Sequence, residues 1–350
     1  MDNRKRAKYY MNLITISVTC LALVALLFIA IGRIRTLMAT VKEYEDRISA
    51  DAGADRLYTA DEVEKLLETD MQDAAIMERA RIQTQIRKEL LQGESMTGTL
   101  RSFYSDELVV EDRGGYGFAM IYETLPQNVF TQEDFAPDDK GLLQYAGDPK
   151  KASLTKGIRV SSENGEIAWS RVPTEEFEAA LVRAGYFDED GVYSADSSFY
   201  SNASAALSYE MQIIPYYQLA DDVSDDIVLA GCRNILEHLE DYEGEFGGQL
   251  YVLLPKHIKG PREDMTELIR DLSALLSADG CKLVLGGDMA ALTLSVKLTE
   301  LEGIPVFLQQ KKDPMYFPYR FCSWEYEPEH KVFGIPGDTG LFYLIDYPAQ

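Results

Sequence analysis

The sequence has few of the residues that build metal and redox sites. Its 350 residues include three histidines and four cysteines. No two of them have the spacing of a zinc-ligand pair, and the cysteines do not form the dense framework of a disulfide-stapled domain. We therefore expect no metal, no cofactor and no obligate disulfide scaffold, and we interpret the cysteines as small buried apolar residues.

Positive charge is also scarce. The chain has 34 Lys and Arg against 58 Asp and Glu, which gives a formal net charge of −24. Nucleic acid and anionic lipid surfaces are bound through basic patches, so we expect neither as a partner. The sequence also lacks a Walker loop, a GxGxxG motif and a GxSxG motif. These absences argue against nucleotide chemistry and serine hydrolysis.

A long apolar run without charges lies near the N-terminus, from Leu13 to Ile31. Its length of about 19 residues suffices to cross the hydrocarbon core of a bilayer as a helix. The basic residues before it predict a cytoplasmic N-terminus and an extracellular C-terminal part. A cleaved signal peptide is the alternative, but its apolar region is usually shorter. We predict a cytoplasmic tail over residues 1–11 and a single transmembrane helix over 12–32, in the cell membrane.

Residues 33–95 have the pattern of a helical stalk. A capping box at Thr59 and Glu62 predicts the start of a second helix, which ends near Gly93. The pattern predicts either a stalk that joins two copies as a homodimer or a helix pair packed on the C-terminal part. The alternating three- and four-residue spacing of a coiled coil is formed by Ile34, Leu37, Val41, Tyr44 and Ile48.

Residues 96–152 predict a small β-rich adaptor. Apolar strands over Glu107–Glu111 and Tyr116–Tyr122 flank a glycine turn, which is the signature of a hairpin. From residue 153 to 350, short apolar strands alternate with amphipathic helices such as Asp225–Leu239. This alternation predicts an α/β fold with a parallel sheet, either a barrel or a doubly wound sheet.

Several short motifs in the C-terminal part resemble, in the same order, those of glycoside hydrolase family 25, the lysozyme-like N-acetylmuramidases. The resemblance implies a TIM-like β/α barrel over residues 153–350, with its site at the C-terminal ends of the strands. It also implies a strand over Ala179–Ala184, where local propensity favours a helix. The motifs are KGIRVSSENGEIAW at 156–169, RAGY at 183–186, PYRF at 318–321, WEY at 324–326 and KVFGIPG at 331–337.

The positions at which the resemblance implies catalytic acids hold other residues. They are Arg159 after the first strand, Pro255 and His257 in place of a DxE pair, and Gly340 near the C-terminus. Glycoside hydrolysis requires one carboxyl to protonate the leaving oxygen and another to stabilise or attack the sugar cation. None of the replacing residues restores such a carboxylate pair. Candidates for a relocated pair are Glu325, Asp288 and Asp338.

Aromatic residues at or near strand ends predict a substrate-binding groove, because rings stack on sugar faces. For Trp169 and Trp324, packing in the core is an equally open interpretation. We predict a pseudoenzyme that binds cell-wall glycan or an envelope protein at the barrel mouth. The alternatives are an active peptidoglycan N-acetylmuramidase with relocated acids and a non-catalytic scaffold of an envelope complex. The aromatic candidates are Trp169, Tyr186, Tyr216, Tyr217, Tyr319, Trp324 and Tyr326.

Overall fold

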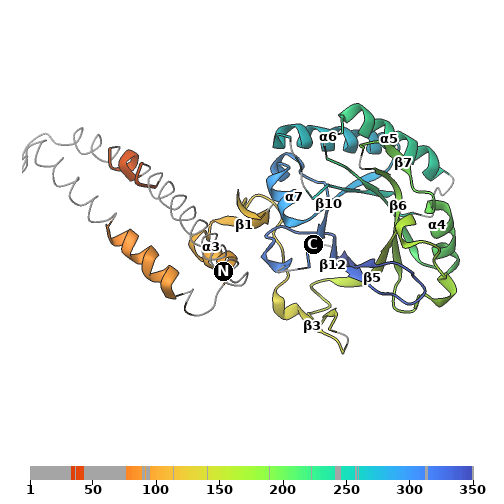
Figure 1. Ribbon diagram of the computed structural model, residues 1–350, viewed down its shortest axis with the longest axis horizontal. Helices are drawn as coiled ribbons and strands as arrows, with labels where there is room; N and C mark the ends of the chain where they lie inside the picture. Colours follow the sequence, from red (N-terminus) through yellow and green to blue (C-terminus); the bar gives the residue numbers. More distant parts are fainter. Residues whose placement is uncertain are drawn as a thin grey trace, which may run out of the picture. The chain divides into compact units, whose positions relative to one another are not determined.

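The chain divides into two compact units, Met1–Ser95 and Met96–Gln350, in the computed structural model (Figure 1). In the first unit the described residues up to 91 are helical. No helix among the described residues is both long and apolar enough to cross a membrane, and the predicted transmembrane run lies outside them. The described residues are 33–35, 37–42, 76–88, 91, 95–112, 114–139, 141–188, 190–221, 223–240, 246–256, 258, 260–311 and 314–348.

The predicted stalk falls only partly on described residues. Ile34, Leu37 and Val41 of the predicted coiled-coil seam lie in helical segments. Tyr44, Ile48 and the capping box lie outside the described residues. The stalk and its dimerisation therefore stay predictions.

The second unit is built around a closed barrel of eight strands. The order around the barrel is β5-β6-β8-β9-β10-β11-β12-β13, and β13 pairs back with β5. Neighbours from β5 to β12 are parallel, whereas β13 is antiparallel to both of its neighbours. The predicted α/β barrel is confirmed, and the doubly wound alternative is wrong because the sheet closes. The strands are β5 (Ser153–Val160), β6 (Ala179–Phe187), β8 (Gln212–Gln218), β9 (Gln249–Leu253), β10 (Lys282–Gly287), β11 (Val306–Gln309), β12 (Ser323–His330) and β13 (Thr339–Asp346).

Strand β6 forms where the family resemblance implied it, over a segment with helix propensity. It pairs with β5 on one side and β8 on the other. The short strand β7 (Tyr193–Ala195) pairs antiparallel with the last three residues of β6. Almost all of its residues are buried. Two flanking ladders of hydrogen bonds and burial of both faces outweigh the local preference of the segment.

Helices cover the barrel from outside along β6, β8 and β10 (Figure 1). Helix α5 (Asp225–Leu239) has the predicted bounds, and the side chains of Val228, Cys232 and Ile235 on its apolar face are buried. This three- and four-residue spacing is the reason that the segment packs as a helix on the sheet. The other covering helices are α4 (Phe199–Ser208), α6 (Arg262–Ala278) and α7 (Met289–Leu294).

Residues 96–152 cover another flank of the same barrel. The predicted hairpin is confirmed as β1 paired antiparallel with β2, and Gly117 of β2 packs against the side chain of Leu294 on α7. Phe130 lies against the ring of Phe321, and the hydroxyl of Tyr343 donates to the carbonyl of Leu143 at 2.8 Å. The adaptor thus forms one unit with the barrel. Its elements are α3 (Met96–Phe103), β1 (Glu107–Asp112), β2 (Gly115–Met120), β3 (Phe135–Pro137) and β4 (Leu143–Tyr145).

Alternation along the strands sorts the barrel side chains into two cores. Tyr216 belongs to a cluster inside the barrel, and its neighbour Tyr217 belongs to a larger cluster between the barrel and the elements that cover it. Successive side chains of a strand point to opposite faces, so each pair of neighbours is divided in this way. The interior cluster is Ala179, Leu181, Ile214, Tyr216, Tyr251, Leu253, Val284, Phe307 and Phe342.

Candidate functional site

An ion pair occupies the centre of the barrel at the C-terminal ends of its parallel strands. Nε of Arg159, near the end of β5, donates to Oε1 of Glu325 on β12 at 2.5 Å. Nε2 of Gln309, the last residue of β11, donates to the other carboxylate oxygen at 2.8 Å. The side chain of Glu325 is 2% exposed and that of Arg159 is 26% exposed. The pair therefore lies at the mouth of the barrel, with the carboxylate beneath the surface.

Gly340 provides the space for this ion pair. It lies beside Arg159 in the β5–β13 ladder. A Cβ atom at position 340 would overlap Oε1 of Glu325 and come within 3.0 Å of Nε of Arg159. The acidic side chain that the family resemblance implies at this position has no room while the pair is present. Arg159 and Gly340 are thus linked by packing, because the glycine leaves the space that the ion pair fills.

The charged groups at this centre shift one another's pKa values. Burial works against the charge on Arg159, but the Glu325 carboxylate and Tyr216 outweigh it, so the pKa of Arg159 is raised. Burial raises the pKa of Tyr216, against the opposing charges of Arg159 and Arg183. Glu325 accepts a hydrogen bond on each oxygen. Each oxygen of the central carboxylate thus has one donor, a guanidinium on one side and an amide on the other.

A second arginine network closes the neighbouring part of the mouth. Nε of Arg183, on β6, donates to Oδ2 of Asp196 at 2.7 Å, and Nη1 donates to Oε1 of Glu163 at 2.5 Å. Nη2 donates to Oγ of Ser162 at 3.1 Å, and the guanidinium lies 4.1 Å from the ring centre of Tyr186. All three nitrogens of Arg183 are engaged, so this network holds the loop after β5 in place.

Gln309, Asp196 and Glu163 belong to the site, although no motif in the sequence points to them. Asp196 is buried and also accepts from the backbone amides of Ser162 and Ser198. The place of these residues at the site depends on two strand pairings, β6 with β7 and β11 with β12. Partners in the β6–β7 hairpin are 6–10 positions apart and partners in the β11–β12 ladder are 16 apart, and their registers place these residues at the site.

The three acids that were candidates for a relocated pair bind three different partners. Glu325 is part of the central ion pair. Oδ1 of Asp288 accepts from the amide of Ala291 and caps α7, and the 52% exposed side chain of Asp338 pairs with Lys331 at 2.8 Å. These acids share no hydrogen bond in the described part of the chain.

The other positions at which the resemblance implies acids lie past the end of β9. Pro255 is half-buried and follows the last residue of β9, Leu253, by two positions. His257 lies outside the described residues. Leu254 is buried between these strand ends, and the amide of Leu254 donates to the carbonyl of Gly286. The described residues among 249–258 include no Asp or Glu.

Two of the aromatic candidates lie at the mouth. Tyr216 is buried inside the barrel between the two arginine networks, and half-buried Tyr186 stacks on Arg183. Trp324 and Tyr326 point to the opposite face of β12 from Glu325, where the ring of Phe135 lies 4.9 Å from that of Trp324. Trp324 is fully buried, and its indole donates to the carbonyl of Gln310 at 2.8 Å.

The other three aromatic candidates also pack outside the barrel. The hydroxyl of Tyr217 donates to the carbonyl of Val228 on α5 at 3.1 Å. Tyr319 receives a hydrogen bond from the amide of Tyr122 at 3.1 Å, and the indole of Trp169 donates to Asn202 on α4 at 3.3 Å. The structure thus brings Tyr186 and Tyr216 together and places the other five under covering elements.

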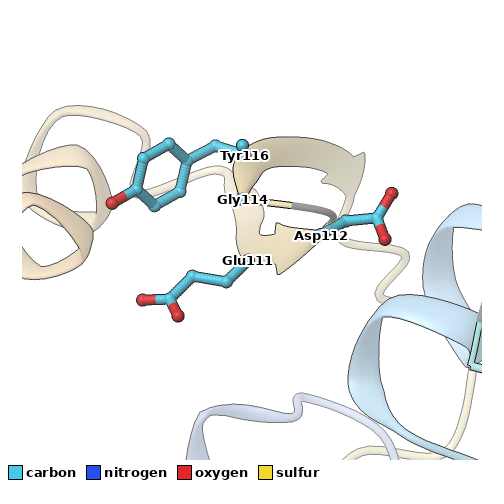
Figure 2. Close-up of a pocket in the computed structure, with 5 residues that line it drawn as sticks. Glu111, Asp112, Gly114 and Tyr116 are labelled. Carbon is cyan, nitrogen blue, oxygen red and sulfur yellow. The ribbon is translucent and has the colours of Figure 1, made fainter. Parts of the chain in front are cut away.

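Two hollows lie beside the hairpin of residues 96–152. The first, of about 270 Å³, lies at the tip of the hairpin. Figure 2 shows that Asp112 points away from Glu111 and Tyr116 there. The second, of about 180 Å³, lies between the hairpin and α7, and its lining includes Asp112, Lys256 and Ser295. The charges of Asp112 and Lys256, which line this second hollow, act on the carboxyl of Asp288.

Asp288→Asn is expected to stabilise the protein increasingly as pH rises. Burial raises the pKa of Asp288, against hydrogen bonds from the amides of Ala291 and Ala290 and the charge of Lys256. In the unfolded chain this carboxyl ionises near pH 3.9. Above that pH the unfolding free energy falls, because the folded state must either ionise a buried carboxyl or keep a proton that the unfolded chain has released. Asparagine does not titrate and caps helices about as well.

Urea unfolding from about pH 3 to about pH 6 measures this effect. The difference in unfolding free energy between Asp288→Asn and the wild type is expected to grow in favour of the variant. Glu302→Gln, at an exposed carboxylate, serves as the control. A difference for Asp288→Asn that is independent of pH contradicts the expectation.

No family model matches the sequence, and no curated protein matches it either. Solved structures with a similar fold include the spore cortex lytic enzyme SleM of Clostridium perfringens, at 14% identity and a TM-score of 0.48 over 57% of this chain and 68% of that chain. The autolysin LytC of Streptococcus pneumoniae, solved with a synthetic peptidoglycan ligand, has 14% identity and a TM-score of 0.47 over 68% of this chain and 58% of that chain. A family 25 glycosyl hydrolase from Bacillus anthracis has 15% identity and a TM-score of 0.42 over 59% of this chain and 93% of that chain. The likeness to family 25 muramidases is one of fold alone, and this chain spans about 58% of the LytC chain.

Proposed function

We propose that this chain is a membrane-anchored protein of the cell exterior whose muramidase-like barrel has lost hydrolysis and binds cell-wall glycan at its mouth. The observation that carries the proposal is the ion pair of Arg159 and Glu325, held by Gln309 at the centre of the strand ends. A fold supports many functions, so the site must decide between them.

Hydrolysis of a glycoside requires two carboxyl groups about 5–9.5 Å apart on either side of the bond. At the mouth of this barrel, positions 159 and 340 carry a permanent cation and no side chain. Glu325, the carboxyl at the centre, is bound by two donors. A polar mouth whose central carboxyl is bound in this way is suited to holding a sugar and not to cleaving its linkage.

Tyr186 is the aromatic residue at the mouth that is placed to contact a sugar. Its ring is half-buried and is held by the guanidinium of Arg183. Rings fixed in this way bind a sugar face at little cost in conformational entropy, and their polar atoms hydrogen-bond to hydroxyls. The proposed glycan site therefore consists of Tyr186, the loop after β5 and the end of the barrel around Arg159.

The proposal is tested by co-sedimentation of the full-length protein with purified peptidoglycan. Saturable binding is expected, and soluble muropeptides are expected to compete for it. Tyr186→Ala should weaken binding, whereas Tyr209→Ala, which removes an exposed ring at the end of α4, should leave it unchanged. Failure to sediment, or sedimentation that muropeptides do not reduce, contradicts glycan binding at the mouth.

One observation favours a second function, as a scaffold in an envelope complex. Tyr116, Phe118, Met120 and Tyr122 alternate along β2 and just beyond it, and each is 38–56% exposed. Exposed apolar stripes of this kind often mark protein contacts. A scaffold of this type would keep its partner when Tyr186 is replaced and lose it when Phe118 is replaced by serine, which a pull-down with an identified partner measures.

A further inference from the structure

The two arginines at the barrel mouth differ in how many of their donors are in use. Arg183 spends all three nitrogens on Asp196, Glu163 and Ser162. Arg159 bonds Glu325 through Nε alone. Its two terminal nitrogens, with two N–H donors each, are left for Tyr216 and for a ligand. The two residues therefore have different tasks, although both are arginines near strand ends.

The surroundings of Arg159 suit the binding of an anion. Its side chain is partly exposed, whereas the apolar interior cluster lies below it and lowers the local dielectric constant. Gly340 beside it presents no side chain, and Gln309 holds the Glu325 carboxylate in place. A guanidinium held in this way offers parallel N–H groups that match the two oxygens of a carboxylate.

We infer that Arg159 binds a carboxylate of the ligand, so that the mouth selects glycan units that carry an acid group. This inference rests on the proposed function and names its substrate class. The carboxylate is either the lactyl acid of the muramyl sugar or the end of its peptide. A net charge of −24 on the chain favours such a single acid group over a polyanion, because the repulsion grows with ligand charge.

An arginine at position 159 suits a ligand that carries an acid group. An acidic residue there repels an acid group of the ligand, whereas Arg159 attracts it. Glu325 neutralises the cation in the empty protein and competes with the ligand for the guanidinium. Removal of the Glu325 charge should therefore strengthen the binding of a carboxylate, which is the opposite of what general damage to the site does.

The test compares ligands by calorimetric titration of the full-length protein. The first probe is the peptidoglycan disaccharide with its free lactyl acid, and the second is the same disaccharide with that acid converted to an amide. The third is an N-acetylated D-alanyl-D-alanine, which carries only a peptide carboxylate. We expect an acid probe to bind about 10-fold or more tightly than the neutral disaccharide, as a charge-assisted hydrogen bond provides. The probe that shows this preference identifies the source of the carboxylate.

Two variants make the inference falsifiable. Arg159→Met should abolish the preference for the acid probe, and Glu325→Gln should tighten binding of that probe several-fold while it leaves the amide unchanged. The second variant keeps the test decisive if the first one does not fold. The inference is overturned if neither acid probe binds the wild type more tightly than the amide does, or if Glu325→Gln loosens binding of the preferred acid probe. If peptidoglycan still sediments the protein, only the inference fails; without sedimentation the proposed function fails as well.

Discussion

Arg159→Met is expected to destabilise the second unit by about 3–5 kcal/mol, because it leaves a buried carboxylate without its cation. Glu325 is 2% exposed, and its partner is Nε of Arg159 at 2.5 Å. Gln309 alone can satisfy only part of that charge. Urea unfolding followed by circular dichroism at neutral pH measures the loss in unfolding free energy.

The matched variant removes both charges. Arg159→Met combined with Glu325→Leu is expected to restore most of the stability or to exceed that of the wild type, since apolar residues replace buried ion pairs without a desolvation cost. The two single changes are therefore expected to be strongly non-additive. A small loss in Arg159→Met, together with additive effects in the double variant, contradicts the buried ion pair.

Phe130→Ala is expected to cost about 3–5 kcal/mol, the usual penalty for deleting a buried aromatic ring. Phe130 is 5% exposed and lies between the adaptor and the barrel. Its ring centre is 5.6 Å from that of Phe135, 5.9 Å from that of Phe321 and 6.0 Å from that of Tyr347. Since one ring supports both parts, the whole second unit should still unfold in a single transition.

Phe333→Ala is the control for this change. The ring of Phe333 is 71% exposed, so its removal should change the unfolding free energy by no more than about 0.5 kcal/mol. Two separate unfolding transitions in the wild type, or equal effects of the two alanine variants, refute the view that residues 96–152 and the barrel share one core.

The sequence was sufficient to predict the barrel and much of its outer layer. The alternation of apolar strands and amphipathic helices gave α5 with its observed bounds, and the order of the family motifs placed β5, β6 and β12. The bounds of α5 follow from local periodicity, whereas the barrel and the placement of β6, over a segment with helix propensity, came from the family resemblance. The N-terminal anchor and the dimerising stalk stay predictions, because their decisive residues lie outside the described part of the chain.

The candidate site was only partly predictable. The absence of an acidic residue at positions 159 and 340 was evident from residue identity. The bond from Arg159 to Glu325 spans 166 positions, so it depends on how the strands pair around the barrel. Alternation does show that neighbours on β12 face opposite sides: Glu325 points inward, so Trp324 packs outside.

Incubation of the unmodified full-length protein with purified peptidoglycan, followed by assay of newly formed reducing ends, tests the account most directly. We expect no release above the buffer blank from acidic to neutral pH, while a known muramidase releases reducing ends from the same preparation. Release that saturates with substrate and disappears in Glu325→Gln would show that the central carboxyl still catalyses cleavage, and the account of a binding barrel would be wrong.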